Sequence, residues 1–392
     1  MSNARAMTGD RSGTTGKRVA LTATGRWVGL GALVYVLTRI PFFVGFVAAQ
    51  TRQGGSISWA PFAERWDGWW YLYLAEFGYP DSLNLPARPL YGPWGFFPIW
   101  PWFIRLVARM TGLPYDVAAG FVTAFCAVGL LAVLGALVEQ RFGRRTAVVA
   151  VLFLGAFPGS LALSMPYTEG LFLLSSVLAI YTASRSWWWW SCIPTFVACA
   201  TRSTGVAVLA ALFILAVATW RRDGRDLRPT LPLLAGLAAF AGAAGYAFVR
   251  TGDPFIWRRA QEQWNQRLDF GAGLWKGFFV NLPQRGIEWH LYGVMAGTVA
   301  LMTLLIALAL PYLHRLPLYW WAYGVVMIGL VFAYSNVGPR PRMILALLPL
   351  FVMAAITAQR SRLMSGLVVG LFSVVSVGFA FAVYFVPYHV TA

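Results

Sequence analysis

The carboxylate of Asp67 lies near the start of an aromatic stretch at residues 65–80, RWDGWWYLYLAEFGYP. The chain has only 14 acidic residues against 31 Lys and Arg, so an acid in such surroundings needs an explanation. Residues 68–77 resemble a short helix that ends at Gly78, with Asp67 directly before it. Asp67 is therefore either a helix cap, which satisfies free backbone N–H groups, or a general base that takes a proton from a substrate. Both interpretations stay open.

Three neighbours of Asp67 would share such a site. Glu64, Arg65 and Trp66 precede it directly in the sequence. Tryptophan and tyrosine side chains are also common where a membrane meets water, so the aromatic character alone is compatible with an interfacial belt.

A second carboxylate, Glu169, begins an apolar run in FPGSLALSMPYTEGLFL, residues 157–173. A proline followed by a glutamate in the first turn is typical of a helix start, which is the structural interpretation. A glutamate beside hydrocarbon is costly unless it is paired or faces a cavity. We therefore predict that Glu169 and Tyr167 line or support a site.

Three arginines are candidates for binding a phosphate. Arg202 interrupts a long apolar stretch in ATRSTG, where burying a charge at the bilayer centre costs about 2.5–3.5 kcal/mol. Arg340 and Arg342 stand just before another apolar run, in YSNVGPRPRM. Guanidinium groups bind phosphate oxygens in pairs, which suits a lipid phosphate. The alternative is that these arginines reach the membrane surface or anchor lipid headgroups.

The composition predicts the elements that must position these residues. Of 392 residues, 59% are hydrophobic and 11% are charged, whereas about a quarter are charged in soluble domains. Apolar runs long enough to cross a roughly 30 Å hydrocarbon core recur along the chain. They are too long and too uniformly apolar for barrel strands. We predict an all-α polytopic membrane protein with about eleven transmembrane helices, in a range of about nine to twelve.

The predicted spans follow the apolar runs. They lie at 27–48, 116–138, 146–163, 166–183, 187–200, 203–219, 230–249, 290–310, 318–334, 343–358 and 364–386. The stretch 187–219 has the alternative of being one broken helix.

The domain organisation is simple. Residues 1–26 form a basic tail, and 27–392 form a single membrane-embedded domain. The first apolar run is too long for a signal-peptide core, so we expect it to be retained with the N-terminus in the cytoplasm. Two long loops, 49–115 and 250–289, then fall on the exterior face, and loops of this length are usually functional. Residues 96–104 suit a helix lying in the membrane interface.

The net charge of +17 does not indicate nucleic-acid binding, because no soluble basic domain is present to hold a nucleic acid. The arginines instead occupy short loops, as the positive-inside rule expects for the cytoplasmic side. These loops hold Arg141, Arg144, Arg145, Arg185, Arg221, Arg222, Arg225, Arg228, Arg315, Arg360 and Arg362. We expect membrane lipid, rather than nucleic acid, as a partner.

Neither cysteine nor histidine indicates a metal centre. The three cysteines lie in apolar runs, where cysteine is a small core residue. The three histidines are far apart, without the spacing of metal ligands. These residues therefore predict no metal-binding site and no cofactor.

Several of these pieces, in this order, resemble the phosphatidylinositol-glycan class V mannosyltransferase family, which has the GT-C glycosyltransferase fold. They are RWDGWWYLYLAEFGY (65–79), FFPIWPWFIRL (96–106), FPGSLALSMPYTEGLFLL (157–174), ATRSTG (200–205) and the arginines before 343. The resemblance covers roughly the first 220 residues well and the remainder loosely. Arginine greatly outnumbers lysine, and alanine, glycine and valine are plentiful, so the composition indicates a high-GC bacterial genome and a plasma-membrane location.

The resemblance implies an inverting enzyme that takes a sugar, most simply mannose, from a polyprenyl-phosphate donor. The acceptor would be a hydroxyl of a glycolipid or lipoglycan on the exterior face, and Asp67 would be the catalytic carboxylate. The first exterior loop lacks the Asp-x-Asp pair of the wider superfamily, so we expect that no divalent metal is required. The chain also has Gly170 where members often carry serine. A lipid phosphate is already a fair leaving group, so one base suffices, whereas hydrolases usually need two carboxyls.

Other functions remain open at the level of sequence. The same fold could transfer a pentose or glucose. A lipid or solute transporter is a second alternative, although transporters tend to place ionisable groups near the midplane in repeated halves. A non-catalytic scaffold is a third, and it would leave the acidic and arginine motifs unexplained.

Overall fold

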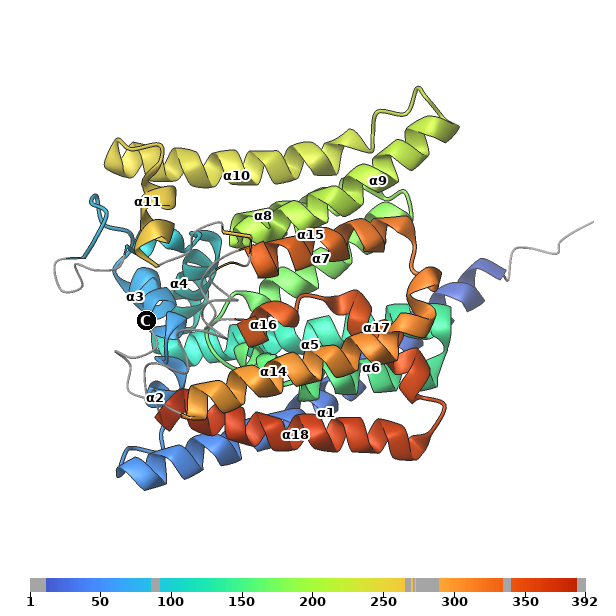
Figure 1. The fold of residues 1–392 in the computed structure, drawn as a ribbon. Coiled ribbons are helices and arrows are strands. Elements are labelled where there is room, and N and C mark those ends of the chain that lie inside the picture. Colours follow the sequence, from blue (N-terminus) through green and yellow to red (C-terminus); the bar gives the residue numbers. More distant parts are fainter. Residues whose placement is uncertain are drawn as a thin grey trace, which may run out of the picture.

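A computed structural model describes residues 12–85, 92–264, 269–270, 272, 289–333 and 340–385 of the chain. Within these ranges, the side chains of 12–24, 289–296, 298 and 340 lie outside the description. Every regular element in the described ranges is a helix (Figure 1), which confirms the predicted all-α architecture.

Each predicted span coincides with an apolar helix. These helices are α1 (Ser12–Gln53), α5 (Tyr115–Phe142), α6 (Arg144–Ala156), α7 (Glu169–Ser184), α8 (Trp188–Thr201), α9 (Val206–Arg222), α10 (Thr230–Thr251), α14 (Trp289–Ala309), α15 (Leu318–Ala333), α17 (Leu348–Ala358) and α18 (Arg362–Phe385). The shorter elements are α2 (Trp59–Ala63), α3 (Asp67–Glu76), η1 (Pro93–Gly95), α4 (Ile99–Thr111), η2 (Pro158–Leu163), η3 (Ser203–Gly205), α11 (Ile256–Gln263), η5 (Leu310–Arg315) and α16 (Arg340–Ile344).

Several predicted spans are shorter than expected. In the described part of the chain, five helices are long and apolar enough to cross a membrane: Gly25–Gln53, α5, Ser203–Arg222, α10 and α18. The span predicted at 146–163 stops as α-helix at Ala156, and Pro158 begins the 3₁₀ turn η2. The span predicted at 343–358 becomes α17 only at Leu348, with Pro349 in its first turn. Proline lacks the N–H that an uninterrupted helix would use at these positions.

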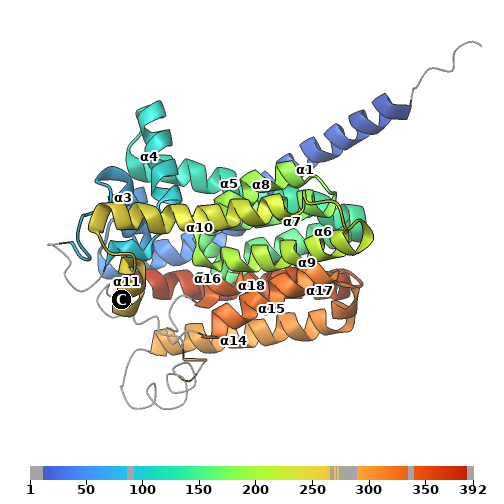
Figure 2. The same cartoon turned by 90° about the horizontal axis from the view of Figure 1, so that it is seen from above.

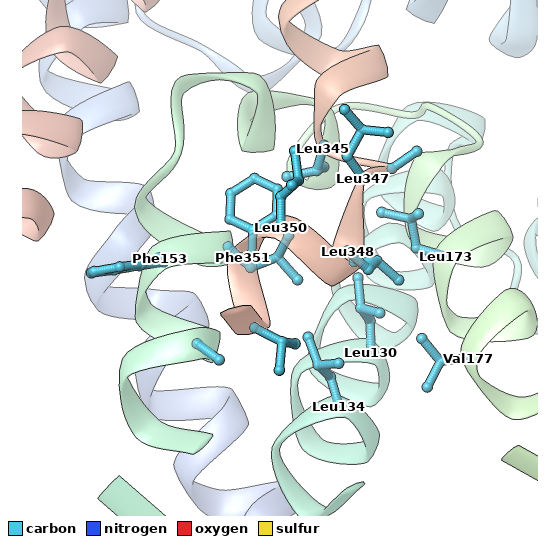
Figure 3. Packing of buried hydrophobic residues seen from close by; sticks show 14 of the residues in the cluster. Leu130, Leu134, Phe153, Leu173, Val177, Leu345, Leu347, Leu348, Leu350 and Phe351 are labelled. Atoms are coloured by element: carbon cyan, nitrogen blue, oxygen red, sulfur yellow. The ribbon is translucent and has the colours of Figure 1, made fainter. Parts of the chain in front are cut away.

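The long helices lie alongside one another in both views (Figures 1 and 2). α1 packs against α18 and α5, and α8 packs against α7 and α10. α17 is buried along nearly its whole length. Figure 3 shows Leu348 and Phe351 of α17 among Leu130, Leu134 and Phe153 of α5 and α6. A helix that is apolar all round fits such an interior position, where every face meets protein.

The two ends of the bundle differ in character. α2, α3, α4 and α11 gather at one end, on the left in Figure 1. The opposite end carries the connections between α5 and α6, α7 and α8, α9 and α10, and α17 and α18, which hold most of the loop arginines. The described parts of the two predicted exterior loops therefore share one end, and the arginine-rich loops share the other.

The two predicted exterior loops pack against each other. α11, from the second loop, donates hydrogen bonds from Gln261 Nε2 to Gly95 O (3.0 Å) and from Trp264 Nε1 to Gly92 O (3.1 Å). Arg250, at the end of α10, donates to the backbone oxygen of Tyr79 (2.9 Å). The second predicted loop thus contributes α11, which covers the first loop.

A close backbone approach joins η2 to α16. A Cβ at Gly159 would lie 1.9 Å from the backbone oxygen of Pro341 and 2.5 Å from its carbonyl carbon. Only glycine fits there, because backbone atoms cannot turn aside as the end of a side chain can. This contact fixes the position of α16 relative to the turn that precedes α7.

We expect Gly159→Ala to destabilise the protein by about 1–3 kcal/mol, the usual cost of overpacking. Unfolding in detergent measures the effect. Gly370→Ala is the matched control, since a Cβ there meets nothing within 4 Å. Equal stability of the two variants would contradict the close approach.

Candidate functional site

The site begins where the chain turns from α2 into α3. Asp67 is the first residue of α3, and Trp66 holds the capping position with φ 53° and ψ −124°. Positive φ is unfavourable for a bulky side chain and persists only where its surroundings enforce it. No side-chain hydrogen bond caps this helix, so the structural interpretation of Asp67 as its N-cap is wrong. The carboxylate is directed elsewhere.

Contacts from two neighbouring segments and one close backbone approach hold the turn before Asp67. Arg65 Nε donates to the backbone oxygen of Val383 at 2.7 Å, and Tyr167 Oη donates to the backbone oxygen of Arg65 at 3.1 Å. A Cβ at Gly68 would lie 2.0 Å from the backbone oxygen of Ala63. The corner before Asp67 is therefore held from α18 and from the loop before α7.

Four charged side chains from distant parts of the chain meet at this corner. Arg342 Nη2 forms an ion pair with Asp67 Oδ2, and Arg342 Nε lies 3.6 Å from Glu169 Oε1. Arg202 Nη1 forms an ion pair with the same Glu169 oxygen and donates to Thr168 Oγ1 at 3.3 Å. Glu169 thus links both arginines, and Arg342 links both carboxylates.

The cluster is shielded from water but not closed. The side chains of Asp67, Arg202 and Arg342 are each 18% exposed, whereas that of Glu169 is 4% exposed. In the described ranges, the second oxygen of Glu169, Oε2, is buried without a hydrogen-bond partner. A buried acceptor without a donor is costly. The cluster therefore offers one place for a ligand hydroxyl or a water molecule.

Aromatic rings complete the surroundings. The Arg342 guanidinium carbon lies 5.0 Å from the centre of the Tyr167 ring, a cation–π contact. Burial disfavours the charged form of Arg342, but Asp67 and Glu169 outweigh it, so its pKa is raised above the ordinary value. Burial and the charge of Asp67 also raise the pKa of Tyr71. Arg342 therefore stays cationic and Tyr71 stays a neutral phenol.

Arg202 reaches the cluster because a helix is interrupted. α8 ends at Thr201, and Arg202 adopts extended backbone (φ −155°, ψ 148°) before η3. The stretch 187–219 is therefore two helices, as predicted, and the arginine between them turns toward Glu169 rather than toward lipid. The interpretation of Arg202 as an interfacial arginine does not fit this contact.

Not all predicted residues join the cluster. Glu64 is exposed at the end of α2, and Arg65 is directed to α18. Trp66 packs beside the core around α1 and α18. Arg340 begins α16, and its side chain lies outside the described part of the chain.

Two residues of the site were not predicted from the sequence. Tyr71 follows Asp67 by four residues, which places both on one face of α3. Thr168 directly precedes Glu169 and accepts a hydrogen bond from Arg202. The helical spacing could have identified Tyr71, but nothing in the sequence distinguished Thr168 from an ordinary helix-start residue.

Nothing in the described ranges resembles a metal centre. No three His, Cys, Asp or Glu side chains there come together closely enough to hold an ion. Whether the chain needs a divalent metal stays a prediction.

Comparison with known proteins bears on the fold. The family model for dolichyl-phosphate-mannose-protein mannosyltransferases matches residues 92–246, less than half of the chain. A sequence search found no match among curated proteins.

Solved structures match over most of the chain. ArnT from Cupriavidus metallidurans bound to undecaprenyl phosphate has a TM-score of 0.50 at 15% identity, covering 89% of this chain and 76% of its own. Apo ArnT from the same organism has a TM-score of 0.45 at 13% identity, covering 90% and 75%. AglB from Archaeoglobus fulgidus, in complex with an inhibitory peptide and a dolichol-phosphate, has a TM-score of 0.45 at 13% identity, covering 86% and 50%.

The chain therefore has the GT-C fold that glycosyltransferases share, as the sequence motifs predicted. The narrower resemblance to the phosphatidylinositol-glycan class V family is not shown by these matches and stays a prediction.

We expect Glu169→Gln to destabilise the protein by about 3 kcal/mol, because it leaves two shielded arginines without their common carboxylate. Glu262→Gln is the control, since that residue forms only an exposed pair with Arg258 and costs about 0.5 kcal/mol. Denaturation in mixed detergents measures both. Loss of stability no greater than in the control would show that Glu169 does not hold the cluster.

Proposed function

We propose that the chain is an inverting glycosyltransferase that moves a sugar from a polyprenyl-phosphate donor to an acceptor hydroxyl. The single observation that supports it is the cluster of Asp67, Glu169, Arg202 and Arg342. The Asp67 carboxylate, with limited exposure to water, adjoins Arg342, and Glu169 joins Arg342 to Arg202. The two arginines are cations able to hold a phosphate. ArnT, whose fold is similar, is bound to such a lipid phosphate.

In the proposed reaction, Asp67 is the base. The acceptor oxygen attacks the anomeric carbon of the sugar from the face opposite the phosphate, and its proton passes to the Asp67 carboxylate. The bond between the anomeric carbon and the phosphate oxygen breaks, and its electron pair stays on the phosphate oxygen. Polyprenyl phosphate leaves with one more negative charge, and the anomeric configuration is inverted.

The arginines stabilise the phosphate that leaves. Arg342 and Arg202 carry fixed positive charges in a site with limited access to water, where preorganised donors act most strongly on developing charge. Arg340 stands two residues from Arg342 and is a further candidate for this role. Glu169 positions Arg202 and Arg342, and its buried oxygen Oε2 is available to a sugar hydroxyl.

The resting cluster implies an exchange of partners. The two carboxylates balance the two arginines in formal charge, so no positive charge is left over for a phosphate. Because Arg342 is paired with Asp67, a donor phosphate must compete with Asp67 for it. When the phosphate takes Arg342, Asp67 is released from its ion pair, and its carboxylate is open to the proton of the acceptor hydroxyl. Donor binding would thereby activate the base.

Mannose is the proposed sugar, and the family match to mannosyltransferases supports it. Pentose and glucose donors remain the alternatives, since sugar choice depends on a few hydroxyl contacts. A panel of polyprenyl-phosphate donors that differ only in the sugar distinguishes them. The acceptor would be a glycolipid, a lipoglycan or another glycan.

The proposed location is a bacterial plasma membrane, with the N-terminus in the cytoplasm and the site on the exterior face. The separation of the molecule's ends supports this orientation. The loop arginines gather opposite the cluster, and short arginine-rich loops face the cytoplasm in membrane proteins. High arginine, alanine and glycine content supports a bacterial source.

We expect Asp67→Asn and Asp67→Ala to lower the rate of mannose transfer by about 10²–10⁴-fold, the usual contribution of a general base. The measurement is product formation by purified enzyme with a polyprenyl-phosphate mannose donor. Asp116→Asn is the control, an aspartate at the beginning of α5 outside the cluster, and it should keep near wild-type activity. Near wild-type transfer by both Asp67 variants would refute the mechanism.

We expect Arg342→Gln to lower transfer by about 10²–10³-fold, as when a preorganised donor to developing charge is removed. Arg250→Gln, at the same end but paired with Asp81, should change the rate by no more than about twofold. Donor KM should rise for Arg342→Gln. An unchanged KM and rate would mean that the phosphate binds elsewhere.

A further inference from the structure

A cavity of about 320 Å³ lies between α5, α7, α15 and α17, opening toward the end of the bundle away from the cluster. Its inner part is apolar. The side chains there include Leu134, Ile180, Leu348, Val352 and Met353. Figure 3 shows Leu134 and Leu348 in this part of the core.

The mouth of the cavity is cationic. Arg141 at the end of α5 and Arg185 after α7 both line it and are exposed. Arg185 Nη2 donates to Gln140 Oε1 at 2.9 Å, and the guanidinium carbon of Arg185 lies 5.1 Å from the centre of the Tyr181 ring. Among the ion pairs in the described ranges, none includes either arginine. Two positive charges therefore flank an apolar opening without a carboxylate to balance them.

Three exposed tryptophans near Arg185 indicate where the mouth of the cavity lies relative to the lipid headgroups. Trp187, Trp189 and Trp190 are 50%, 69% and 70% exposed and follow Arg185 closely in the sequence. Exposed tryptophans gather at the level of lipid headgroups. Arg185 therefore lies where the phosphates of the adjoining leaflet lie.

We propose that this cavity binds an anionic phospholipid from that leaflet, with its phosphate on Arg141 and Arg185 and part of one acyl chain between α5 and α17. Basic pockets between transmembrane helices bind anionic headgroups in this way. The volume is at the lower end of small-molecule sites, roughly 300–1,000 Å³, so it holds part of a chain rather than a whole lipid.

The apolar depth favours a lipid over a free anion. A phosphate ion would occupy the mouth and leave the apolar part empty, and an empty apolar cavity forfeits packing contacts. An acyl chain fills it. Leu348 lines the cavity and begins α17, only four residues after the end of α16 at Ile344. The acyl chain would therefore also support α16, the segment that carries Arg342. The site is separate from the proposed catalytic cluster, so its test does not depend on transfer activity.

The test is lipid binding by the purified full chain in nonionic detergent. Phosphatidylglycerol should raise the melting temperature to a plateau, and phosphatidylcholine should have a much smaller effect. Arg141→Gln with Arg185→Gln should weaken the apparent affinity for phosphatidylglycerol by about tenfold or more, since two charge-assisted hydrogen bonds are lost. Arg221→Gln with Arg222→Gln, the same charge change on α9 outside the cavity, should keep the affinity within about twofold.

A second pair of variants tests the apolar part. Leu137→Trp places a larger side chain in the cavity lining and should also weaken binding, whereas Leu33→Trp, on the exposed face of α1, should not. Three results would overturn the proposal. They are equal stabilisation by inorganic phosphate alone, equal stabilisation by phosphatidylcholine, and an equal loss of affinity in the α9 control.

Discussion

The arrangement of the site depends on one shielded carboxylate that two arginines share. Glu169 Oε1 pairs with Arg202 and lies 3.6 Å from Arg342 Nε. A charge this far from water is stable only with partners, so Glu169 requires the break after α8 and the short helix α16. Each arginine is itself tolerable near hydrocarbon because this acid is present. Asp67 then joins through Arg342, which contacts both acids.

The backbone around the cluster is irregular where its charges meet. Trp66 adopts positive φ, Arg202 is extended between two helices, and Gly159 touches the backbone of Pro341. Regular helices would carry these side chains apart. The contacts that hold the irregular segments, such as Tyr167 to the backbone of Arg65, come from neighbouring elements, so packing of the whole bundle determines the geometry of the site.

The helical membrane architecture was predictable because apolar runs of sufficient length have few alternative structures. The participation of Glu169, Arg202 and Arg342 was also predictable, since isolated charges in apolar stretches need partners. Their pairing was not, because it depends on tertiary contacts. Arg202 and Glu169 come from different segments, and Arg342 meets Asp67 and Glu169 across more than a hundred positions of sequence. The lengths of α6 and α17 were overestimated because hydropathy does not report helix geometry. One apolar run continues past Pro158, where α6 gives way to a 3₁₀ turn, and a later one begins before Leu348, where α17 starts. The direction of Arg65 toward Val383 likewise depends on tertiary packing alone.

The brevity of α17 has a consequence for how the protein enters the bilayer. With 11 residues it is only about 16 Å long at 1.5 Å per residue, too short to be retained in lipid by itself. Its buried faces meet mainly α14 and α6, and Leu348 and Phe351 pack among side chains of α5 and α6 (Figure 3). During synthesis, α17 can therefore settle only after those earlier helices have already assembled, and the translocation machinery cannot release it as an independent unit. Arg342 lies in α16, shortly before α17, so we expect it to pair with Asp67 and Glu169 late in assembly.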